Sequence, residues 1–234
     1  MRGLILVEGQ TEERLIKDTI APAFWPWSLF LEPTILVTKM VKDGPNFKGG
    51  VTSYERCRND LAKLLNSSGG ALVTTMLDYY GLPSDFPGMS TRPNGSPRER
   101  ASHVQQAIWH DFGEPQNFVP FLALHEFEAW LFSCPSTLPD VLTVPTQQPE
   151  FARLCNCYDS PEDINDGHDT APSKRIMQMF PTYKKTLHGP TAAKRIGLNK
   201  IRSACPHFDD WLQRLEAMAP GPPPSNNDSD ARTV

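Results

Sequence analysis

Four acidic residues follow hydrophobic segments, at the points where strands are expected to end. They are Glu8 (after 4–7), Asp78 (after 71–77), and Glu126 and Glu128 (after 118–124). Because ligands of open α/β sheets bind outside the carboxyl ends of the strands, these side chains are expected to converge. Converging carboxylates repel one another and raise one another's pKa, so such a cluster favours bound divalent cations. Ligands that are all oxygen favour Mg²⁺ or Mn²⁺, and a pair of such ions can promote phosphodiester cleavage.

Simpler roles compete with this interpretation. Any one of these acids, taken alone, is a common helix cap or surface charge. His125 stands beside Glu126 and is a candidate proton shuttle, although a hydrogen-bonded structural histidine fits the same position. The joint placement of the acids at strand ends, rather than any single residue, predicts the metal site.

The charge is unevenly distributed along the chain. The net charge is −4, yet residues 170–208 contain eight lysine and arginine residues and no acidic residue. A basic segment beside an acidic body suits an enzyme that brings a polyanion to metal ions, and it also suits plain solvated helices. The candidate substrate-binding residues are Lys174, Arg175, Lys184, Lys194 and Arg195 in or near this segment, and Lys48 in a glycine-containing loop.

Strands and helices alternate through the first part of the chain. Strands are expected at 4–7, 34–38, 71–77 and 118–124, with helices starting near Thr11 and over 51–66 and 98–112; helical periodicity restarts at 125–132. This order predicts an α/β fold with a mostly parallel sheet flanked by helices and a C-terminal helical extension. The expected units are a core at 1–132, a loop-rich and then helical basic extension at 133–219 packed on the core, and a disordered tail at 220–234. In the extension, helices are expected near 149–155, 173–180, 191–204 and 208–218.

Composition excludes several classes of protein. Hydrophobic residues make up 39 % and charged residues 21 %, which is typical of a globular protein. No apolar run approaches the length of a membrane span, and the N-terminus lacks the features of a secretory signal, so a cytoplasmic protein without membrane contact is expected. The five cysteines lack paired spacing and predict neither a disulfide framework nor a structural zinc site.

The sequence resembles known families at several motifs. Residues 4–12, Leu-Ile-Leu-Val-Glu-Gly-Gln-Thr-Glu, look like the first motif of Toprim domains in the form seen in OLD-type nucleases, and 72–78 occupies the place of their Asp-x-Asp strand end. Most of residues 1–215 resembles the bacterial domain-of-unknown-function family 4276, described as Toprim-like. The motifs are 77–83 (Leu-Asp-Tyr-Tyr-Gly-Leu-Pro), 124–129 (Leu-His-Glu-Phe-Glu-Ala), 164–167 (Ile-Asn-Asp-Gly), 170–176 (Thr-Ala-Pro-Ser-Lys-Arg-Ile) and 205–208 (Cys-Pro-His-Phe).

The resemblance implies a Toprim-like core, with Glu8 as acid or base and Asp78 as a metal ligand. Tyr80 stands where Toprim nucleases have their second Asp, so Asp85, Glu126 or Glu128 must replace it or metal binding is weakened. The implied function is a Mg²⁺- or Mn²⁺-dependent nuclease acting on DNA or RNA, as the effector of an anti-phage defence system beside an ABC- or SMC-like ATPase. The alternatives are a non-catalytic regulatory or sensor subunit of that ATPase complex, and nucleotidyl transfer as in primases. The oligomeric state is left open.

Overall fold

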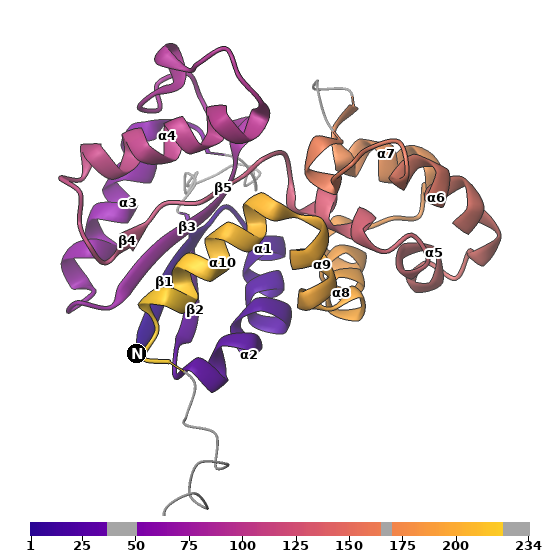
Figure 1. Ribbon diagram of the computed structural model, residues 1–234, viewed down its shortest axis with the longest axis horizontal. Helices are drawn as coiled ribbons and strands as arrows, with labels where there is room; N and C mark the ends of the chain where they lie inside the picture. Colours follow the sequence, from indigo (N-terminus) through magenta and orange to yellow (C-terminus); the bar gives the residue numbers. More distant parts are fainter. Residues whose placement is uncertain (37–50, 165–169, 222–234) are drawn as a thin grey trace, which may run out of the picture.

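A parallel β-sheet organises the part of the chain that the computed structural model describes, residues 1–36, 51–164 and 170–221 (Figure 1). The strand order is β2-β1-β3-β4, and β5 pairs with β3 beyond the end of β4. Every strand pair is parallel. The strands are β1 (Arg2–Val7), β2 (Phe30–Ile35), β3 (Leu72–Asp78), β4 (Phe118–Val119) and β5 (Leu122–Ala123).

Both faces of the sheet are buried, as the continuous apolar run in β1 predicts. Ile5 and Val7 point into one hydrophobic cluster, while Leu4 and Leu6 point into a second cluster on the opposite face. This alternation follows from the two-residue period of a strand. Each face therefore needs its own layer of helices.

One layer consists of α3 (Tyr54–Ser67) and α4 (Pro97–Asp111). Helix α4 begins with a capping box in which Ser96 and Glu99 satisfy each other's backbone N–H groups. The opposite layer contains α1 (Gln10–Leu15), the π-helical turn η1 (Ile16–Ile20), α2 (Ala21–Phe24) and the C-terminal helix α10 (Pro206–Met218). The 3₁₀ turn η2 (Trp25–Trp27) leads from α2 toward β2.

Helix α10 packs directly on the central strands. The Trp211 indole N–H donates to Oγ1 of Thr74 in β3 at 2.9 Å. The same indole stacks on Phe121, with ring centroids 4.3 Å apart and planes 5° from parallel. The end of the described chain therefore completes a core that the first strands begin.

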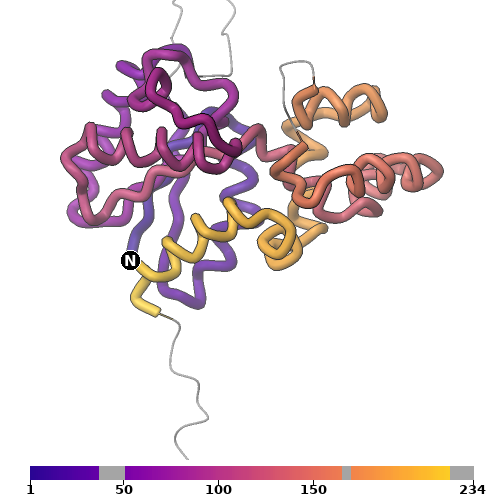
Figure 2. Tube along the Cα trace, turned by 45° about the horizontal axis from the view of Figure 1, so that its top comes forward, coloured from indigo at the N-terminus to yellow at the C-terminus, as the bar shows by residue number. Residues whose placement is uncertain are grey.

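A helical lobe projects from the end of the sheet, to the right in Figure 1, and Figure 2 shows it from a second direction. It is formed by η5 (Phe127–Ser133), α5 (Thr137–Val141), η6 (Pro145–Gln147), α6 (Gln148–Cys155), η7 (Pro161–Asp163) and α7 (Pro172–Met179). Helices α8 (Lys185–Ile196) and α9 (Leu198–Ala204) lead back to α10. No helix in the described ranges is both long and apolar enough to cross a bilayer.

The predicted fold class, an α/β protein with a mostly parallel sheet flanked by helices and a C-terminal helical extension, is confirmed. Several local features differ from the sequence analysis, among them the strand expected over 118–124, which is two short strands, β4 and β5. Strand β2 begins four residues before the expected start, because an edge strand tolerates Pro33. Residues 127–133 form 3₁₀ turns, and the helix expected over 191–204 is two helices that meet at Gly197, where φ is +84°. Much of the expected tail, from residue 222 onward, lies outside the described residues.

Candidate active site

Five carboxylates gather at the carboxyl end of the sheet. Glu8 follows β1, and Asp78 ends the neighbouring strand β3, so the parallel pairing places them side by side. The backbone N–H of Asp78 donates to Glu8 Oε1 at 2.7 Å. Glu12 lies on the first turn of α1, one helical turn after Glu8, and Glu126 and Glu128 flank the start of η5. This set is called the acidic cluster below.

Lys185, the first residue of α8, supplies a positive charge to the acidic cluster. Its Nζ lies 3.2 Å from Oε2 of Glu128, and it is 3.8 Å from an oxygen of Glu126 and 4.0 Å from an oxygen of Glu12. The amine also stands 5.4 Å from the centre of the Phe127 ring. Burial lowers the pKa of Lys185, but the facing carboxylates outweigh this effect and hold the pKa above its usual value. The amine therefore stays charged at neutral pH.

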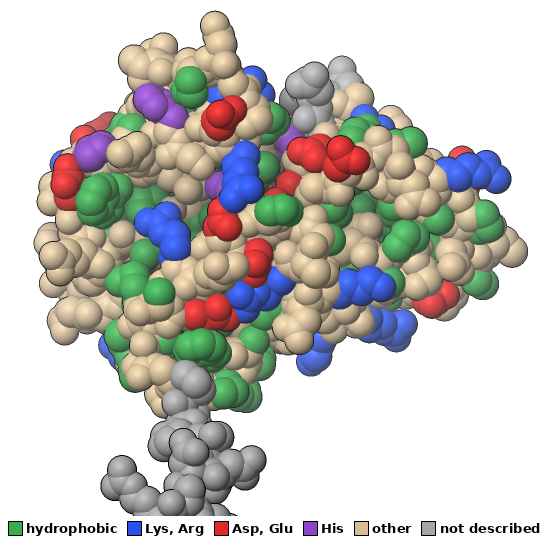
Figure 3. Space-filling view, viewed as in Figure 1, with side chains coloured by type: hydrophobic (Ala, Val, Ile, Leu, Met, Phe, Trp, Pro, Cys, Tyr) green, Lys and Arg blue, Asp and Glu red, His purple; other side chains and the backbone are tan. Residues whose placement is uncertain are grey.

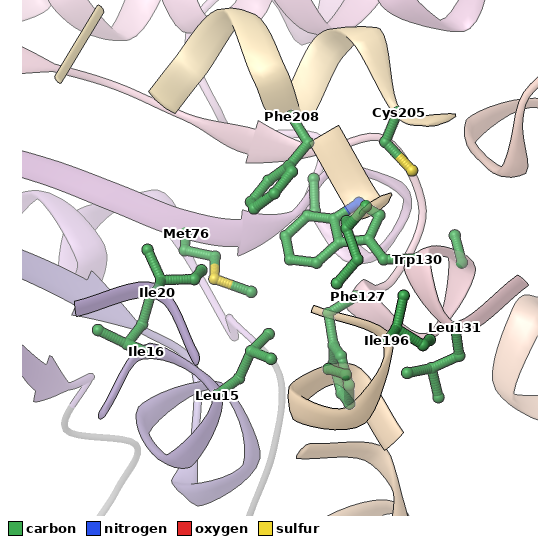
Figure 4. Packing of buried hydrophobic residues seen from close by; sticks show 14 of the residues in the cluster. Leu15, Ile16, Ile20, Met76, Phe127, Trp130, Leu131, Ile196, Cys205 and Phe208 are labelled. Atoms are coloured by element: carbon green, nitrogen blue, oxygen red, sulfur yellow. The ribbon is translucent and has the colours of Figure 1, made fainter. Parts of the chain in front are cut away.

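The turn that carries Glu126 and Glu128 is fixed by hydrophobic packing. Phe127 and Trp130 point into the core among residues of α1, α8 and α10 (Figure 4). The Trp130 ring lies 4.1 Å from the Phe208 ring, centroid to centroid. Because the apolar side chains of η5 are buried, the acidic residues on either side of Phe127 have little freedom to move away from each other.

Glu126 accepts hydrogen bonds from two elements besides its own. The N–H and the hydroxyl of Ser173, at the start of α7, donate to its two oxygens at 2.9 and 3.0 Å. The Tyr80 hydroxyl donates to Oε1 at 3.3 Å. Glu126 thus caps α7 and joins the lobe to the sheet, and much of its capacity to accept bonds is already used.

Glu128 is in the opposite situation. Its side chain is fully buried, at 0 % exposure, and neither of its oxygens accepts a well-aligned hydrogen bond from the described residues. The buried hydroxyl of Tyr183 likewise has no such partner among the described residues. The Lys185 amine, 3.2 Å from Oε2, is therefore the charged group that compensates the buried Glu128 carboxylate.

Burial raises the pKa of three members of the acidic cluster. The pKa of Glu8 rises to about 7, since desolvation outweighs the bond from the Asp78 N–H and Glu12 adds repulsion. The pKa of Glu128 rises to about 8 for the same main reason, in spite of Lys185. Desolvation and the charge of Glu8 hold the pKa of Asp78 well above its usual range. Strongly perturbed carboxyl groups in one place are typical of functional sites.

These shifts predict a pH dependence for the metal-free protein. A carboxyl group whose pKa is higher in the folded than in the unfolded state holds its proton longer in the folded state, so stability falls as pH rises. The window runs from about pH 4.5, the ordinary value, to about pH 8, the raised value of Glu128. In EDTA, the melting temperature is expected to decrease across this window, and the decrease should be smaller in Glu8→Gln.

The matched control for this measurement is Glu150→Gln, at an exposed position on α6. Its pH profile should follow that of the unsubstituted protein. A melting temperature that rises between pH 5 and pH 8 would contradict the desolvation of the acidic cluster.

The chemistry of the cluster suits a hard cation, since its donors are carboxylate oxygens. As the side chains stand, however, no three histidine, cysteine or acidic residues within 1–36, 51–164 and 170–221 are arranged to hold an ion together. The position of Lys185 gives a physical reason, because its amine lies among three of the carboxylates. The lysine acts as a built-in counter-ion of the cluster.

Two residues that the sequence analysis assigned to the site have other contacts. Asp85 Oδ2 accepts the backbone N–H of Tyr54 at 2.9 Å, at the start of α3. His125 is buried, and its Nε2 lies 2.9 Å from the backbone carbonyl of Glu162. These contacts give Asp85 a helix-capping role and place the His125 ring against the turn η7.

The basic segment does not act as one surface. Arg202 is paired with Asp209 and Glu216 of α10, and Arg175 donates to the Thr170 carbonyl and lies over the Tyr158 ring. Exposed basic residues remain on and before α8, namely Lys184, Lys194 and Arg195. Lys174 is half-buried, and Lys48 lies outside the described residues. On the face shown in Figure 3, basic side chains are interspersed with acidic ones.

Sequence reasoning missed Glu12 and Lys185 as members of the site. The position of Glu12 could have been predicted, because a residue four positions after Glu8, in the first turn of a helix, lies at the same end of the sheet as Glu8. The role of Lys185 could not be predicted, because its contact with the carboxylates depends on how α8 packs against α1 and η5. The sequence shows only that it belongs to the basic segment. The bonds that Ser173 and Tyr80 make to Glu126 depend on tertiary packing in the same way.

The chain matches a known protein family. A family model described as "Domain of unknown function (DUF4276)" matches residues 7–216, which include every residue of the acidic cluster and Lys185. The chain belongs to this family. The resemblance seen in the sequence motifs of this DUF4276 protein is thereby confirmed, and its family name assigns no activity.

The other comparisons add less. No curated protein matches the DUF4276 chain. Among solved structures, it is similar to the C-terminal region of the Burkholderia pseudomallei OLD protein, with 16 % sequence identity and a TM-score of 0.42. That match covers 92 % of this chain and 98 % of the other.

Proposed function

We propose that this protein is a metal-dependent nuclease that cleaves phosphodiester bonds of DNA or RNA. The observation that carries the proposal is the acidic cluster itself: five carboxylates at the ligand-binding end of a parallel sheet, three of them with raised pKa values, around one lysine. A structural cluster would gain nothing from so much buried like charge. A site that binds cations and a polyanion would use it.

The residues best placed to hold Mg²⁺ or Mn²⁺ are Glu8, Glu12 and Asp78. Unlike Glu126, they accept no hydrogen bond from Ser173. Glu8 directly follows β1, Asp78 ends the adjacent strand β3, and Glu12 lies on the helix that follows β1. When bound, such an ion would neutralise the phosphate and lower the pKa of water or a hydroxyl group. Glu128 faces Lys185, with Oε2 3.2 Å from its amine.

Two residues of the chain fit direct roles. Glu8 has one oxygen fixed by the Asp78 N–H, and its pKa in the metal-free protein is about 7, so its second oxygen suits proton transfer to or from a substrate. Lys185 stays charged and faces the same space, so its amine suits the negative charge that develops on a phosphate during cleavage. The exposed residues Lys184, Lys194 and Arg195 would contact the nucleic-acid backbone farther from the site.

The alternative is a non-catalytic regulatory or sensor subunit, and one observation favours it. Lys185 already compensates three carboxylates, so the site has a cation without binding metal. In either case an ABC- or SMC-like ATPase partner and a role in phage defence are part of the proposal.

The test combines cleavage with metal-induced stabilisation. The purified protein is incubated with end-labelled DNA and RNA, single-stranded and duplex, in Mg²⁺, Mn²⁺ or EDTA, and cleavage is expected only with metal. The same ions should raise the melting temperature by mass action, and Asp78→Asn should lose most of that rise while Asp140→Asn, at an exposed position on α5, keeps it. No cleavage of any substrate, together with equal stabilisation of both variants, would favour the regulatory subunit.

A further inference from the structure

The two tyrosines that follow β3 have different environments. Tyr79 is buried at 7 % exposure, and its hydroxyl accepts a hydrogen bond from Arg92 Nη1 at 3.1 Å, so it belongs to the packing beneath α3 and α4. Tyr80 is 41 % exposed. It is one of the few large hydrophobic side chains that the described chain exposes, and it stands two residues after Asp78.

The hydroxyl of Tyr80 is tethered to the acidic cluster. It donates to Glu126 Oε1 at 3.3 Å, and that carboxylate is held in turn by Ser173. The bond, which is long for one between two oxygens, holds one end of the side chain near the cluster and leaves much of the side chain open to solvent. The ordering of this side chain is thus achieved before any ligand arrives, which reduces the entropic cost of binding to it.

An exposed aromatic ring beside carboxylates favours a particular kind of contact. The carboxylates repel anionic groups unless a cation is bound, whereas a neutral nucleobase can stack on the ring in either case. Inside a duplex, both faces of a base are covered by its neighbours, so only an unpaired base presents a free face. A phosphodiester held at the acidic cluster would bring an adjacent base of its own strand within reach of the ring.

We infer that Tyr80 is a substrate-contacting residue that stacks on an unpaired base next to the phosphodiester bound at the acidic cluster. This inference rests on the proposed nuclease function and narrows its substrate class to single strands or unpaired segments of DNA or RNA. It gives Tyr80 a role of its own at the position where a second aspartate was expected from the Toprim resemblance.

The experiment measures binding to two probes in the presence of Mn²⁺. One is oligothymidylate, and the other is an abasic oligomer of the same length, which has the same phosphates without bases. Binding is measured on ice over a short incubation, which keeps the probes intact, and the parent is the unsubstituted protein. The parent protein is expected to bind the base-bearing probe about ten-fold more tightly, a difference of about 1.4 kcal/mol. Tyr80→Leu should remove this preference, and Tyr80→Phe, which keeps the ring, should retain it.

The control is Trp25→Leu, which removes an aromatic side chain that is 58 % exposed. Trp25 precedes β2 and lies at the amino ends of the strands, opposite the acidic cluster. This substitution should leave the preference for the base-bearing probe unchanged.

If Tyr80→Leu keeps the full preference, the ring does not contact the base and the inference is wrong, while the nuclease proposal stands on its own cleavage test. If Tyr80→Phe loses the preference as fully as Tyr80→Leu, the hydroxyl acts through Glu126 and Tyr80 is only a positioning residue. If the parent protein binds neither probe, the inference and the nuclease proposal both fail.

Discussion

The Glu8→Gln protein is expected to cleave nucleic acid at least about 100-fold more slowly than the unsubstituted protein, because a positioned general acid or base contributes about 10²–10⁴ in rate. The substitution is nearly isosteric. The amide oxygen of glutamine can still accept the Asp78 N–H that Glu8 Oε1 accepts at 2.7 Å, so the local structure is expected to persist. What is lost is a titrating group with a pKa of about 7 and one negative charge of the acidic cluster.

The rate should be measured in single turnover at saturating Mn²⁺, which separates a loss of chemistry from a loss of metal affinity. Glu55→Gln is the matched control, since Glu55 is exposed on α3 and the change of charge is the same. It should cleave at the rate of the unsubstituted protein. An undiminished rate in Glu8→Gln would remove Glu8 from the reaction, whatever the other carboxylates do.

The second large effect is expected from Lys185→Met. In metal-free protein this change leaves Glu12, Glu126 and Glu128 without their counter-ion. Removing one partner of a buried ion pair costs about 3–5 kcal/mol, and the exposure of the Lys185 side chain, 36 %, reduces this to about 2 kcal/mol. For a chain of this size the loss corresponds to a fall of about 4–8 °C in melting temperature. The loss should be greatest above pH 8, where Glu128 can no longer relieve the repulsion by keeping its proton.

The decisive measurement is a double-mutant cycle with Glu128→Gln. If the amine serves mainly to neutralise Glu128, Lys185→Met should cost much less stability in the Glu128→Gln background than alone. Lys63→Met removes a lysine that is 75 % exposed and should have little effect. Equal losses of stability in both backgrounds would show that Lys185 and Glu128 are not coupled.

Cleavage by Lys185→Met should also be strongly reduced, even at metal concentrations that restore its melting temperature.

The sequence predicts the positions of the strand-end acids better than it predicts their roles. Glu8 and Asp78 lie together because the parallel neighbours β1 and β3 end at the same side of the sheet, and the continuous apolar run in β1 already indicates a strand covered on both faces. The role of Glu126 could not be predicted from the order of strands, because its hydrogen bonds come from Ser173 and Tyr80, which are distant in the sequence. The capping role of Asp85 depends in the same way on where α3 begins.

Local sequence patterns also failed where a longer-range contact determined the geometry. Residues 127–132 have the apolar content of a buried helix, yet they form 3₁₀ turns whose side chains fill the space between α1, α8 and α10. Lys185 is one of eight basic residues in its segment, and nothing in its immediate neighbours separates it from Lys184. Only the packing of α8 against α1 turns one lysine inward and leaves the other exposed.

The contact of Trp211 with Thr74 and Phe121 has a consequence for how the chain reaches its native state during synthesis. One face of the central strands is covered partly by α10, so this face stays open to water until residues 206–218 have left the ribosome. The strand ends that carry Glu8 and Asp78 are made before the covering helix α10 and before the counter-ion Lys185. The acidic cluster is therefore completed only after α8 has been made, and a nascent chain halted before α8 holds its carboxylates without the lysine that balances them.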